Sequence, residues 1–405
     1  MQTPSSSSSS SAPRRYWLLV VFLVLASALG SFFNDMFTPA LPAMCRFFHT
    51  SVPTMQMGIT TGMIGLALGQ FLLGPLSDRY GRKPILICSL LLFIVAAVVS
   101  VYSTSVHFFI WCRLFQGLGA SGGYFLARTM PADIYSGRPL AKLMALVGAI
   151  NGVAPASAPV FGGVASDTWG WQSVFVILAV FAAVVLVISH WVKESLPPSR
   201  RATGSWLSLF GGYAGLVRRR PFMVHVCFKG LALGILFAYI SASPYILQNH
   251  YGLSQTVYGL VIGANALFVV TGSMLALRFR PLKRAAFAGS GLVLAAVAAQ
   301  AYALWHVHSI WVFEGCTVIM LLGLGLIFTT TNTLSMNEGR DRAGEASAIL
   351  GISGYVVGAV AAPMVGMGNV LHSTAIVYLS LACATFVCAI ASRRLAPDLD
   401  TQSGK

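Results

Sequence analysis

The chain has 405 residues, of which 56% are hydrophobic and only 9% are charged. A soluble protein has about 25% charged residues, so this composition excludes the soluble globular class and predicts a membrane protein. The net charge of +15 does not indicate a nucleic-acid-binding protein, because the basic residues lie in short loops between apolar runs and form no patch with interleaved aromatic residues.

The N-terminal segment 1–15 is a run of serines followed by Pro13-Arg14-Arg15. It has little to bury and is expected to be a disordered tail. Two arginines, an apolar run and Ala26-Ser27-Ala28 also fit a cleavable signal peptide. We favour an uncleaved first helix, because the apolar pattern continues to Phe37 and carries an acidic residue.

Twelve apolar runs of about 20 residues, the length that crosses a bilayer as a helix, follow the tail. In the first half they lie near 16–38, 53–73, 84–103, 107–128, 143–164 and 172–192. In the second half they lie near 222–246, 255–277, 285–305, 309–333, 345–367 and 373–392. The sequence therefore predicts an all-α membrane protein with twelve transmembrane helices in two six-helix halves.

The basic residues predict the orientation of these spans. Arg113, Arg128 and Lys229 fall within spans and only Arg46 falls on the side opposite the termini. All other Lys and Arg residues then lie on the side of the two termini, which the positive-inside rule makes cytoplasmic. The expected units are halves 16–192 and 222–394, a cytoplasmic linker 193–221, and a cytoplasmic tail 395–405.

The end of the first span carries the candidate proton carrier, Asp35, beside Asn34. An ionisable group inside a membrane helix is costly and is a functional candidate by default. Arg113 enters the membrane from the same side and lies roughly 9 Å deep, so we expect it in the layer of Asp35, where its movement would switch the protonation of the acid. A structural ion pair or a water-facing acid is the alternative.

The segment 74–83, Gly-Pro-Leu-Ser-Asp-Arg-Tyr-Gly-Arg-Lys, is predicted to be a charged turn in water between the second and third spans. Asp78 is expected at the start of the eleventh helix, where the helix dipole stabilises an anion. Arg82 is expected to pair with Asp133, at the end of the fourth span. These contacts would form a conformational latch on the cytoplasmic side; the alternative is a signal for topology alone.

Small residues recur every four positions in the fifth span, at 148–156, and in the eleventh, at 354–366. This spacing lets helices approach closely, so the two helices are expected to meet between the halves and to gate one side. Pro155 and Pro159 would add a bend. Packing without gating is the alternative.

The two halves repeat each other. Ala158-Pro159-Val160-Phe161-Gly162 is echoed by Ala362-Pro363-Met364-Val365-Gly366, an offset of 204 residues, and two further matches occur at offsets of 205 and 206. Parallel repeats of this kind bind a substrate between the halves near the bilayer midplane. Lys229 is expected either to line this cavity or to reach the cytoplasmic surface, and Glu314, near Trp305 and Trp311, to belong to an interface belt.

These motifs resemble the major facilitator superfamily. The segment 74–86 resembles its loop signature, and Arg113-Leu114-Phe115-Gln116-Gly117 resembles its R-x-x-Q-G motif. Ala158-Pro159-x-x-Gly162-Gly163 is similar to the bent-helix motif of its antiporters, with Ala158 in place of glycine. The resemblance, together with the small-residue spacing and the two prolines, predicts a gating helix with these residues: Gly152, Pro155, Pro159, Gly162 and Gly163.

A narrower resemblance is to the bicyclomycin/chloramphenicol-resistance (Bcr/CflA) branch of drug:proton antiporters. It is carried by 34–42, Ser243-Pro244-Tyr245 and 343–348. It implies that Asn34 and Asp35 contact substrate, and that the protein exports mainly neutral amphipathic drugs from a bacterial inner membrane in exchange for protons. Some relatives carry a second acid two turns before Asp35, where this chain has Ser27, so strongly cationic drugs are not favoured.

No motif in the chain indicates an enzyme, a cofactor or a metal site. A small-molecule drug, a proton and the lipid bilayer are the expected partners, and a monomer is the expected functional unit. Two alternatives remain open: a proton-coupled or facilitative transporter of an endogenous small metabolite, and a membrane receptor or scaffold that transports nothing.

Overall fold

A computed structural model describes residues 11–201, 211–307 and 309–395 of the chain. The first half contains α1 Ser11–Asp35, η1 Thr38–Ala40, α2 Leu41–Phe47, α3 Val52–Tyr80, α4 Arg82–Val101, α5 Val106–Ile134, α6 Gly137–Trp169 and α7 Gln172–Trp191. The second half contains α9 Arg220–Pro244, η4 Tyr245–His250, α10 Gln255–Ala276, α11 Leu282–Tyr302, η5 Ala303–Val307, α12 Ile310–Glu338, η6 Arg340–Arg342, α13 Ala343–Met364 and α14 Val370–Leu395. Between the halves lie η2 Pro198–Arg200 and α8 Gly211–Val217.

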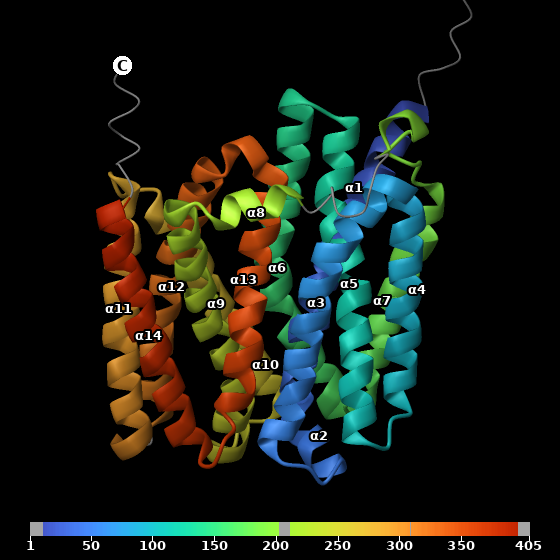
Figure 1. Ribbon diagram of the computed structural model, residues 1–405. Helices are drawn as coiled ribbons and strands as arrows, with labels where there is room; N and C mark the ends of the chain where they lie inside the picture. Colours follow the sequence, from blue (N-terminus) through green and yellow to red (C-terminus); the bar gives the residue numbers. More distant parts are fainter. Residues whose placement is uncertain (1–10, 202–210, 308, 396–405) are drawn as a thin grey trace, which may run out of the picture.

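The long helices stand side by side in two groups, α1 to α7 and α9 to α14 (Figure 1). We call the end that carries α8 the linker end, and the end that carries α2 and η4 the far end. Eleven helical segments in the described ranges are long and apolar enough to cross a bilayer. The twelfth, α5, contains Arg113, Gln116 and Arg128, and it packs among α1, α3 and α4. The predicted twelve-helix, two-half fold is therefore confirmed.

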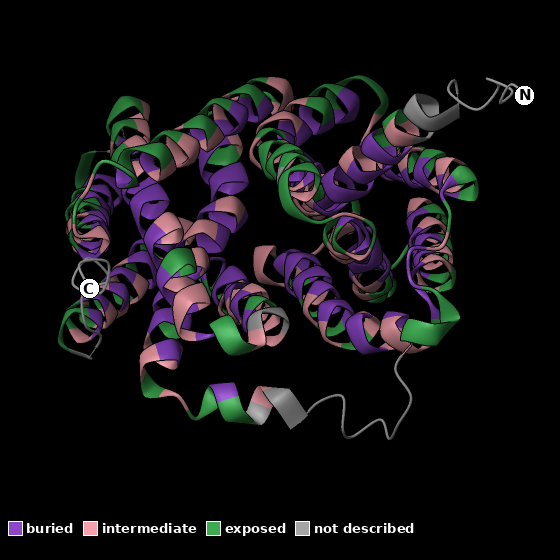
Figure 2. Cartoon of the chain, turned by 90° about the horizontal axis from the view of Figure 1, so that it is seen from above, coloured by how far each residue is buried: buried purple, intermediate pink, exposed green. Residues whose placement is uncertain are grey.

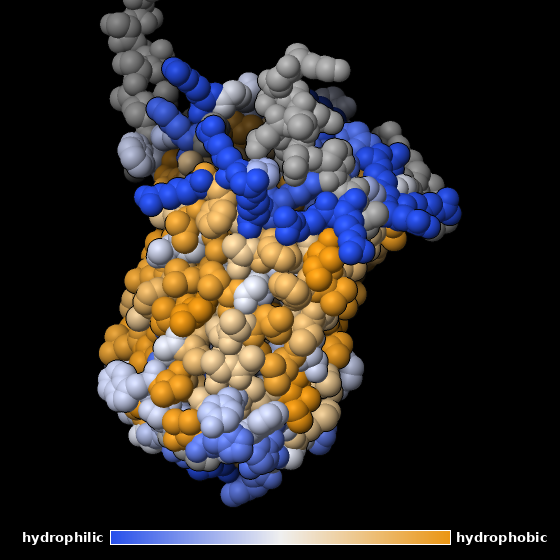
Figure 3. Space-filling model, turned by 90° about the vertical axis from the view of Figure 1, so that its left-hand side faces the viewer, coloured by the Kyte–Doolittle hydropathy of each residue, from blue (hydrophilic) through white to orange (hydrophobic). Residues whose placement is uncertain are grey.

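Each half has its own apolar core, and the outer face is apolar as well. Buried residues lie mainly where helices face one another, and exposed residues lie mainly on the outer faces (Figure 2). Large aliphatic residues such as Val95, Val180 and Val387 are more than half exposed. They belong to an apolar belt between polar caps, as the side of the second half shows (Figure 3). A bilayer would cover this belt, so the protein is a multi-pass membrane protein.

The helices extend further at the linker end than the apolar runs predict. α3 continues through Pro75 to Tyr80 and α4 begins at Arg82, so the predicted turn 74–83 is wrong and Gly81 alone connects the two helices. Its φ of +105° is one that L side chains rarely adopt, which requires glycine. Charged residues are compatible with helices in water, so the apolar length sets the membrane crossing but not the helix length.

The expected tails and linker are described only in part. Helix α1 begins at Ser11, inside the stretch 1–15 for which a disordered tail was expected. The rest of that stretch, 1–10, lies outside the described residues, as do 202–210 of the linker and 396–405 of the expected tail 395–405.

The halves meet along two pairs of helices, α3 with α13 and α6 with α10. The expectation that the fifth-span and eleventh-span helices, α6 and α13, meet each other is therefore wrong. The repeat accounts for the pattern. By the offset of about 205 residues, α10 is the equivalent of α3 and α13 is the equivalent of α6, so each contact joins α3 or its equivalent in one half to α6 or its equivalent in the other. Each of the two helices with small residues thus has its own partner in the opposite half, α10 for α6 and α3 for α13.

Candidate functional site

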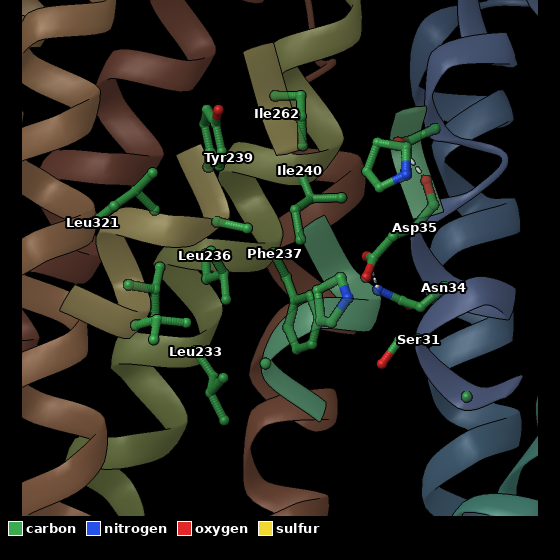
Figure 4. Close-up of a pocket in the computed structure, with 18 of the residues that line it drawn as sticks. Ser31, Asn34, Asp35, Leu233, Leu236, Phe237, Tyr239, Ile240, Ile262 and Leu321 are labelled. Carbon is green, nitrogen blue, oxygen red and sulfur yellow. Dashed lines mark hydrogen bonds between the residues drawn. The ribbon is translucent and has the colours of Figure 1, made fainter. Parts of the chain in front are cut away.

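Two adjoining cavities lie between the halves. The first, which we call the central cavity, has a volume of about 600 Å³ and is lined by Asn34 and Asp35 of α1 (Figure 4). The second, which we call the vestibule, has a volume of about 950 Å³ and lies toward the linker end. Five residues line both: Tyr124, Leu233, Phe237, Asn332 and Tyr355. The two cavities are therefore parts of one continuous path.

The far end of this path is closed by hydrogen bonds between the halves. In each, a side chain of one half bonds a backbone or side-chain group of the other. The pairs are Gln56 Nε2 to Ser241 O at 3.1 Å, Thr60 Oγ1 to Ala359 O at 2.9 Å, Gln248 Nε2 to Pro39 O at 2.9 Å, and Thr256 Oγ1 to Asp167 Oδ2 at 2.6 Å. The structure thus holds the cavity shut at the far end.

Asp35 is the last residue of α1 and is 8% exposed. Its Oδ1 accepts a hydrogen bond from Asn34 Nδ2 at 2.8 Å, and its backbone carbonyl accepts one from the Thr38 hydroxyl at 2.8 Å. The side chains of Asn34 and Asp35, with Ser31 one turn earlier, face apolar residues across the central cavity (Figure 4). These apolar residues are Leu236, Phe237 and Ile240. Within the described ranges, no basic side chain forms an ion pair with this carboxylate.

Arg113 of α5 is fully buried but does not contact Asp35. Its guanidinium donates to Gln116 Oε1 at 2.8 Å, to Phe33 O at 3.2 Å and to Gly58 O at 3.4 Å. It also lies over two rings of the first span, 3.9 Å from the centroid of Phe33 and 4.0 Å from that of Phe37. Neutral acceptors and ring faces therefore stabilise this charge.

Arg113 contacts the residues two positions before and two positions after Asp35 in the sequence, so the two side chains lie at a similar depth, as expected. They do not form an ion pair with each other. Phe33 lies two residues before Asp35 on α1, and at 100° per residue a step of two turns a side chain by about 200° around a helix. Arg113 thus contacts the face of α1 that points into the first half, while Asp35 faces the cavity from the opposite face.

Helix α6 contributes the predicted gating residues in two ways. Gly152, Pro155 and Pro159 line the central cavity. Toward the far end, a Cβ on Gly162 would collide with the carbonyl of Met36, and one on Gly163 with the backbone of Gln255 in α10. These glycines therefore permit the close approach that closes the far end, whereas their gating role stays a prediction. α6 remains one α-helix through both prolines.

The three predicted latch residues meet at the linker end of the first half. Arg82 Nη1 lies 2.5 Å from Asp78 Oδ1 and its Nε lies 2.9 Å from Asp133 Oδ2. Asp78 thus pairs with Arg82, its own neighbour at i+4, in the part of the chain that the structure describes. The expected contact of Asp78 with the start of α13 is not made in this state, and the latch stays a prediction.

Glu194 is part of the same cluster and was missed by the sequence analysis. Its carboxylate accepts the backbone N–H groups of Arg82 at 3.0 Å and Lys83 at 3.1 Å, at the start of α4. An anion at a helix start is stabilising, because the first amides have no partner within the helix. The acid lies in the linker, far from α4 in sequence, so no local pattern indicated it.

The second half adds polar groups that the sequence left undecided. Lys229 lines the vestibule and donates from Nζ to Asn332 Oδ1 at 2.6 Å. Glu314 is half-buried and accepts from Asn265 Nδ2 at 2.8 Å, and the same amide nitrogen lies 2.8 Å from the hydroxyl oxygen of Tyr239. Glu314 thus points to a neighbouring helix, and the interface belt expected for it is wrong, whereas the exposed Trp311 fits such a belt.

The sequence profile of the Major Facilitator Superfamily matches residues 23–363. The chain belongs to this superfamily. Among solved structures, the partially occluded inward-open xylose transporter XylE of E. coli superposes with a TM-score of 0.74, at 13% identity, over 96% of this chain and 99% of that one. At this identity the likeness shows the fold of the superfamily and not the substrate.

Curated relatives in the superfamily are more similar in sequence. The chain is 31% identical to the uncharacterized MFS-type transporter YdgK of Bacillus subtilis (strain 168), over 88% of this chain and 92% of the relative. It is 26% identical to multidrug resistance protein MdtL of Salmonella heidelberg (strain SL476), over 79% and 80%. It is 28% identical to a chloramphenicol resistance protein of Pseudomonas aeruginosa, over 62% and 59%. The chain is thus a superfamily transporter with drug-resistance relatives, and its predicted resemblance is confirmed.

Proposed function

We propose that this transporter exports drugs by proton-coupled antiport with alternating access. The observation that carries the proposal is Asp35: it is an acid in the wall of a closed-ended central cavity, and it has a neutral donor, Asn34, as its neighbour. The apolar opposite wall suits amphipathic molecules, and we expect mainly neutral drugs of the chloramphenicol or bicyclomycin type. The names of the relatives support this class.

Antiport follows from competition at one carboxyl group. A proton on Asp35 turns an acceptor oxygen into a donor, and a bound drug that donates a hydroxyl or amide N–H needs the acceptor form. Drug and proton then exclude each other at the same group. Asn34, with both a donor and an acceptor, can serve the drug in either state.

The linker end is proposed to face the cytoplasm of a bacterial inner membrane. The basic loops lie at that end, and the positive-inside rule assigns it to the cytoplasm together with both termini. The structure would then represent the inward-facing state, ready to load a drug from the cytoplasm. We propose that one chain is the functional unit, because the path lies between the halves of a single chain.

Opening to the other side requires exchange of one set of contacts for another. The hydrogen bonds at the far end must break, and the linker ends of α3 and α13 must approach. Asp78 would then leave Arg82 for the start of α13, where the helix dipole stabilises an anion. Each state thus has contacts that the other lacks, which is the requirement for a two-state transporter.

The function is tested by drug susceptibility in a pump-deficient bacterial host, followed by flux in proteoliposomes. Expression should raise the inhibitory concentration of at least one neutral amphipathic drug, and addition of that drug to energised vesicles should release protons from the acidic side. Proton movement in the same direction as the substrate would instead indicate a symporter of a metabolite, and the absence of any flux would indicate a receptor or scaffold.

A further inference from the structure

The vestibule carries two basic side chains from different halves. Arg128 of α5 and Lys229 of α9 both line it, and they are close enough to interact electrostatically. Arg128 lies 4.1 Å above the ring of Tyr124 and donates to its hydroxyl at 2.5 Å. Lys229 donates to Asn332. Both partners are neutral, so like charges face one cavity without a counter-ion among the residues described as lining it.

Gln70 of α3 also lines the vestibule, but its amide nitrogen is buried and is not open to a ligand there. The side chain interacts with Tyr355 instead. The preference of this cavity for a ligand charge therefore depends on Arg128 and Lys229.

No acidic side chain is among the described residues that line the vestibule. Asp78 and Glu345 interact electrostatically with Tyr213 of α8, outside the vestibule lining, and Asp78 is paired with Arg82. The titratable side chains that line the vestibule besides the two cations are Tyr124 and Tyr355. Two cations with neutral partners and no acid in the lining favour an anionic ligand group.

We propose that the vestibule binds the acidic group of amphipathic organic anions, and that these are a substrate class of the transporter. The ligand would place a carboxylate or phosphate against Arg128 and Lys229. Its apolar body would lie along Leu233 and Phe237, which continue from the vestibule into the central cavity. This inference rests on the proposed export function and extends it beyond neutral drugs.

The test is a binding measurement with two probes that differ only in charge. Full-length protein in nanodiscs of phosphatidylcholine is titrated with 1-pyrenebutyric acid and with its primary amide, and dissociation constants are read from pyrene anisotropy. The acid should bind at least tenfold more tightly than the amide. Equal binding of the two probes would overturn the proposal.

Variants test which residues cause the preference for the acid over the amide. Arg128→Gln with Lys229→Gln should reduce the acid-to-amide ratio to less than twofold, and each single change should give an intermediate value. Arg128→Lys with Lys229→Arg keeps both charges and should keep the ratio. Arg138→Gln, an exposed cation outside the vestibule, is the matched control and should also keep it. A full preference in the folded double glutamine variant would overturn the assignment, and the single variants provide the same test where the double variant does not fold.

An acidic lipid headgroup carries the same kind of anionic group as the proposed ligand. The second part of the experiment therefore varies the lipid composition of the nanodisc. Phosphatidylglycerol in the disc should leave binding of the soluble acid within twofold. Competition that abolishes the preference would assign the site to lipid and overturn the substrate proposal. Binding is measured without a proton gradient, so its outcome is independent of whether Asp35 couples transport to protons.

Discussion

Arg113 Nη2 donates to the backbone carbonyl of Phe33 across 3.2 Å, and so binds the first transmembrane helix by its backbone. The ring of Phe33 lies under the same guanidinium, 3.9 Å from its carbon. The buried charge thus fixes one face of the helix whose other face presents Asp35 to the central cavity. Arg113 does not contact Asp35, so we expect it to act on Asp35 through the position of this helix.

Removal of the proton-binding group should uncouple transport. Asp35→Asn preserves the shape and an acceptor oxygen for Asn34 but cannot bind a proton in the physiological range. Efflux driven by a pH gradient in proteoliposomes should fall to background, while exchange of labelled for unlabelled drug without a gradient continues. Glu314→Gln is the matched control, because Glu314 is a half-buried acid of a transmembrane helix that does not line the central cavity. Wild-type gradient-driven efflux in Asp35→Asn would reject Asp35 as the proton carrier.

Arg113 should tolerate lysine better than alanine. Arg113→Ala removes the donor to the buried Gln116 Oε1, and an unsatisfied buried group costs about 1–3 kcal/mol. Transport should fall more than tenfold, together with thermal stability. Arg113→Lys keeps the charge but not the planar fork, and should retain part of the activity. Flux and melting temperature would be measured for both, with the exposed Arg138→Gln as control, and near-wild-type flux in both would make Arg113 a bystander.

The sequence predicted what depends on local apolar length and on internal repetition. The twelve spans and the two halves follow from these, and Asp35 could be singled out because an acid within an apolar run is conspicuous. The contacts of Arg113 could not be predicted, because the face of the first span that it meets depends on how α1, α3 and α5 pack. The tyrosines and Gln70 of the vestibule were missed, although a glutamine within the apolar run 53–73 was a usable signal.

The partners of α6 and α13 show a second limit of sequence patterns. Small residues every four positions correctly indicated close helix contacts, yet such a pattern does not identify the partner helix. The pairing of α6 with α10 and of α3 with α13 is a property of how the halves dock. The prediction of a turn at 74–83 was wrong for a different reason. The charged composition indicated that this segment lies in water, but helices also continue into water, on both sides of Gly81.

Asp78→Asn should favour the state seen here. If the aspartate binds the start of α13 when the linker end closes, its loss removes about 1–2 kcal/mol from that state. The present state loses the ion pair with Arg82, but the Asp78 side chain in that pair is 46% exposed and such pairs contribute only about 0–1 kcal/mol, so the ratio of the two states should still shift toward the present one. Spin labels on Ser136→Cys and Leu277→Cys, at the linker ends of α6 and α10, would report the opening in a background free of the seven native cysteines. Distances should shift toward the open linker end and turnover should slow. A wild-type distance distribution in a variant that had lost transport would reject the latch.

Gln56→Leu should shift the same balance in the opposite direction. The side chain of Gln56 donates to Ser241 O across the closed far end at 3.1 Å, and this bond joins the halves only in the present state. A hydrogen bond contributes about 0.5–1.5 kcal/mol net, so its loss should change the ratio of states by roughly 2- to 12-fold toward a closed linker end. The same pair of labels should therefore report shorter distances. Thr61→Val is the matched control, because Thr61 also lies on α3 but its hydroxyl bonds carbonyls within the first half, those of Met57 and Ile110.

The two shifts provide a combined test of the two-state description. Because Asp78 and Gln56 stand at opposite ends of α3 and stabilise opposite states, their effects should add, and the variant with both Asp78→Asn and Gln56→Leu should return close to the wild-type distance distribution. Its substrate turnover should recover in part, since neither state is then favoured excessively. A double variant that is as open at the linker end as Asp78→Asn alone would show that the far-end hydrogen bond does not contribute to the balance, and the closure would then depend on the packing of Gly162 and Gly163 instead.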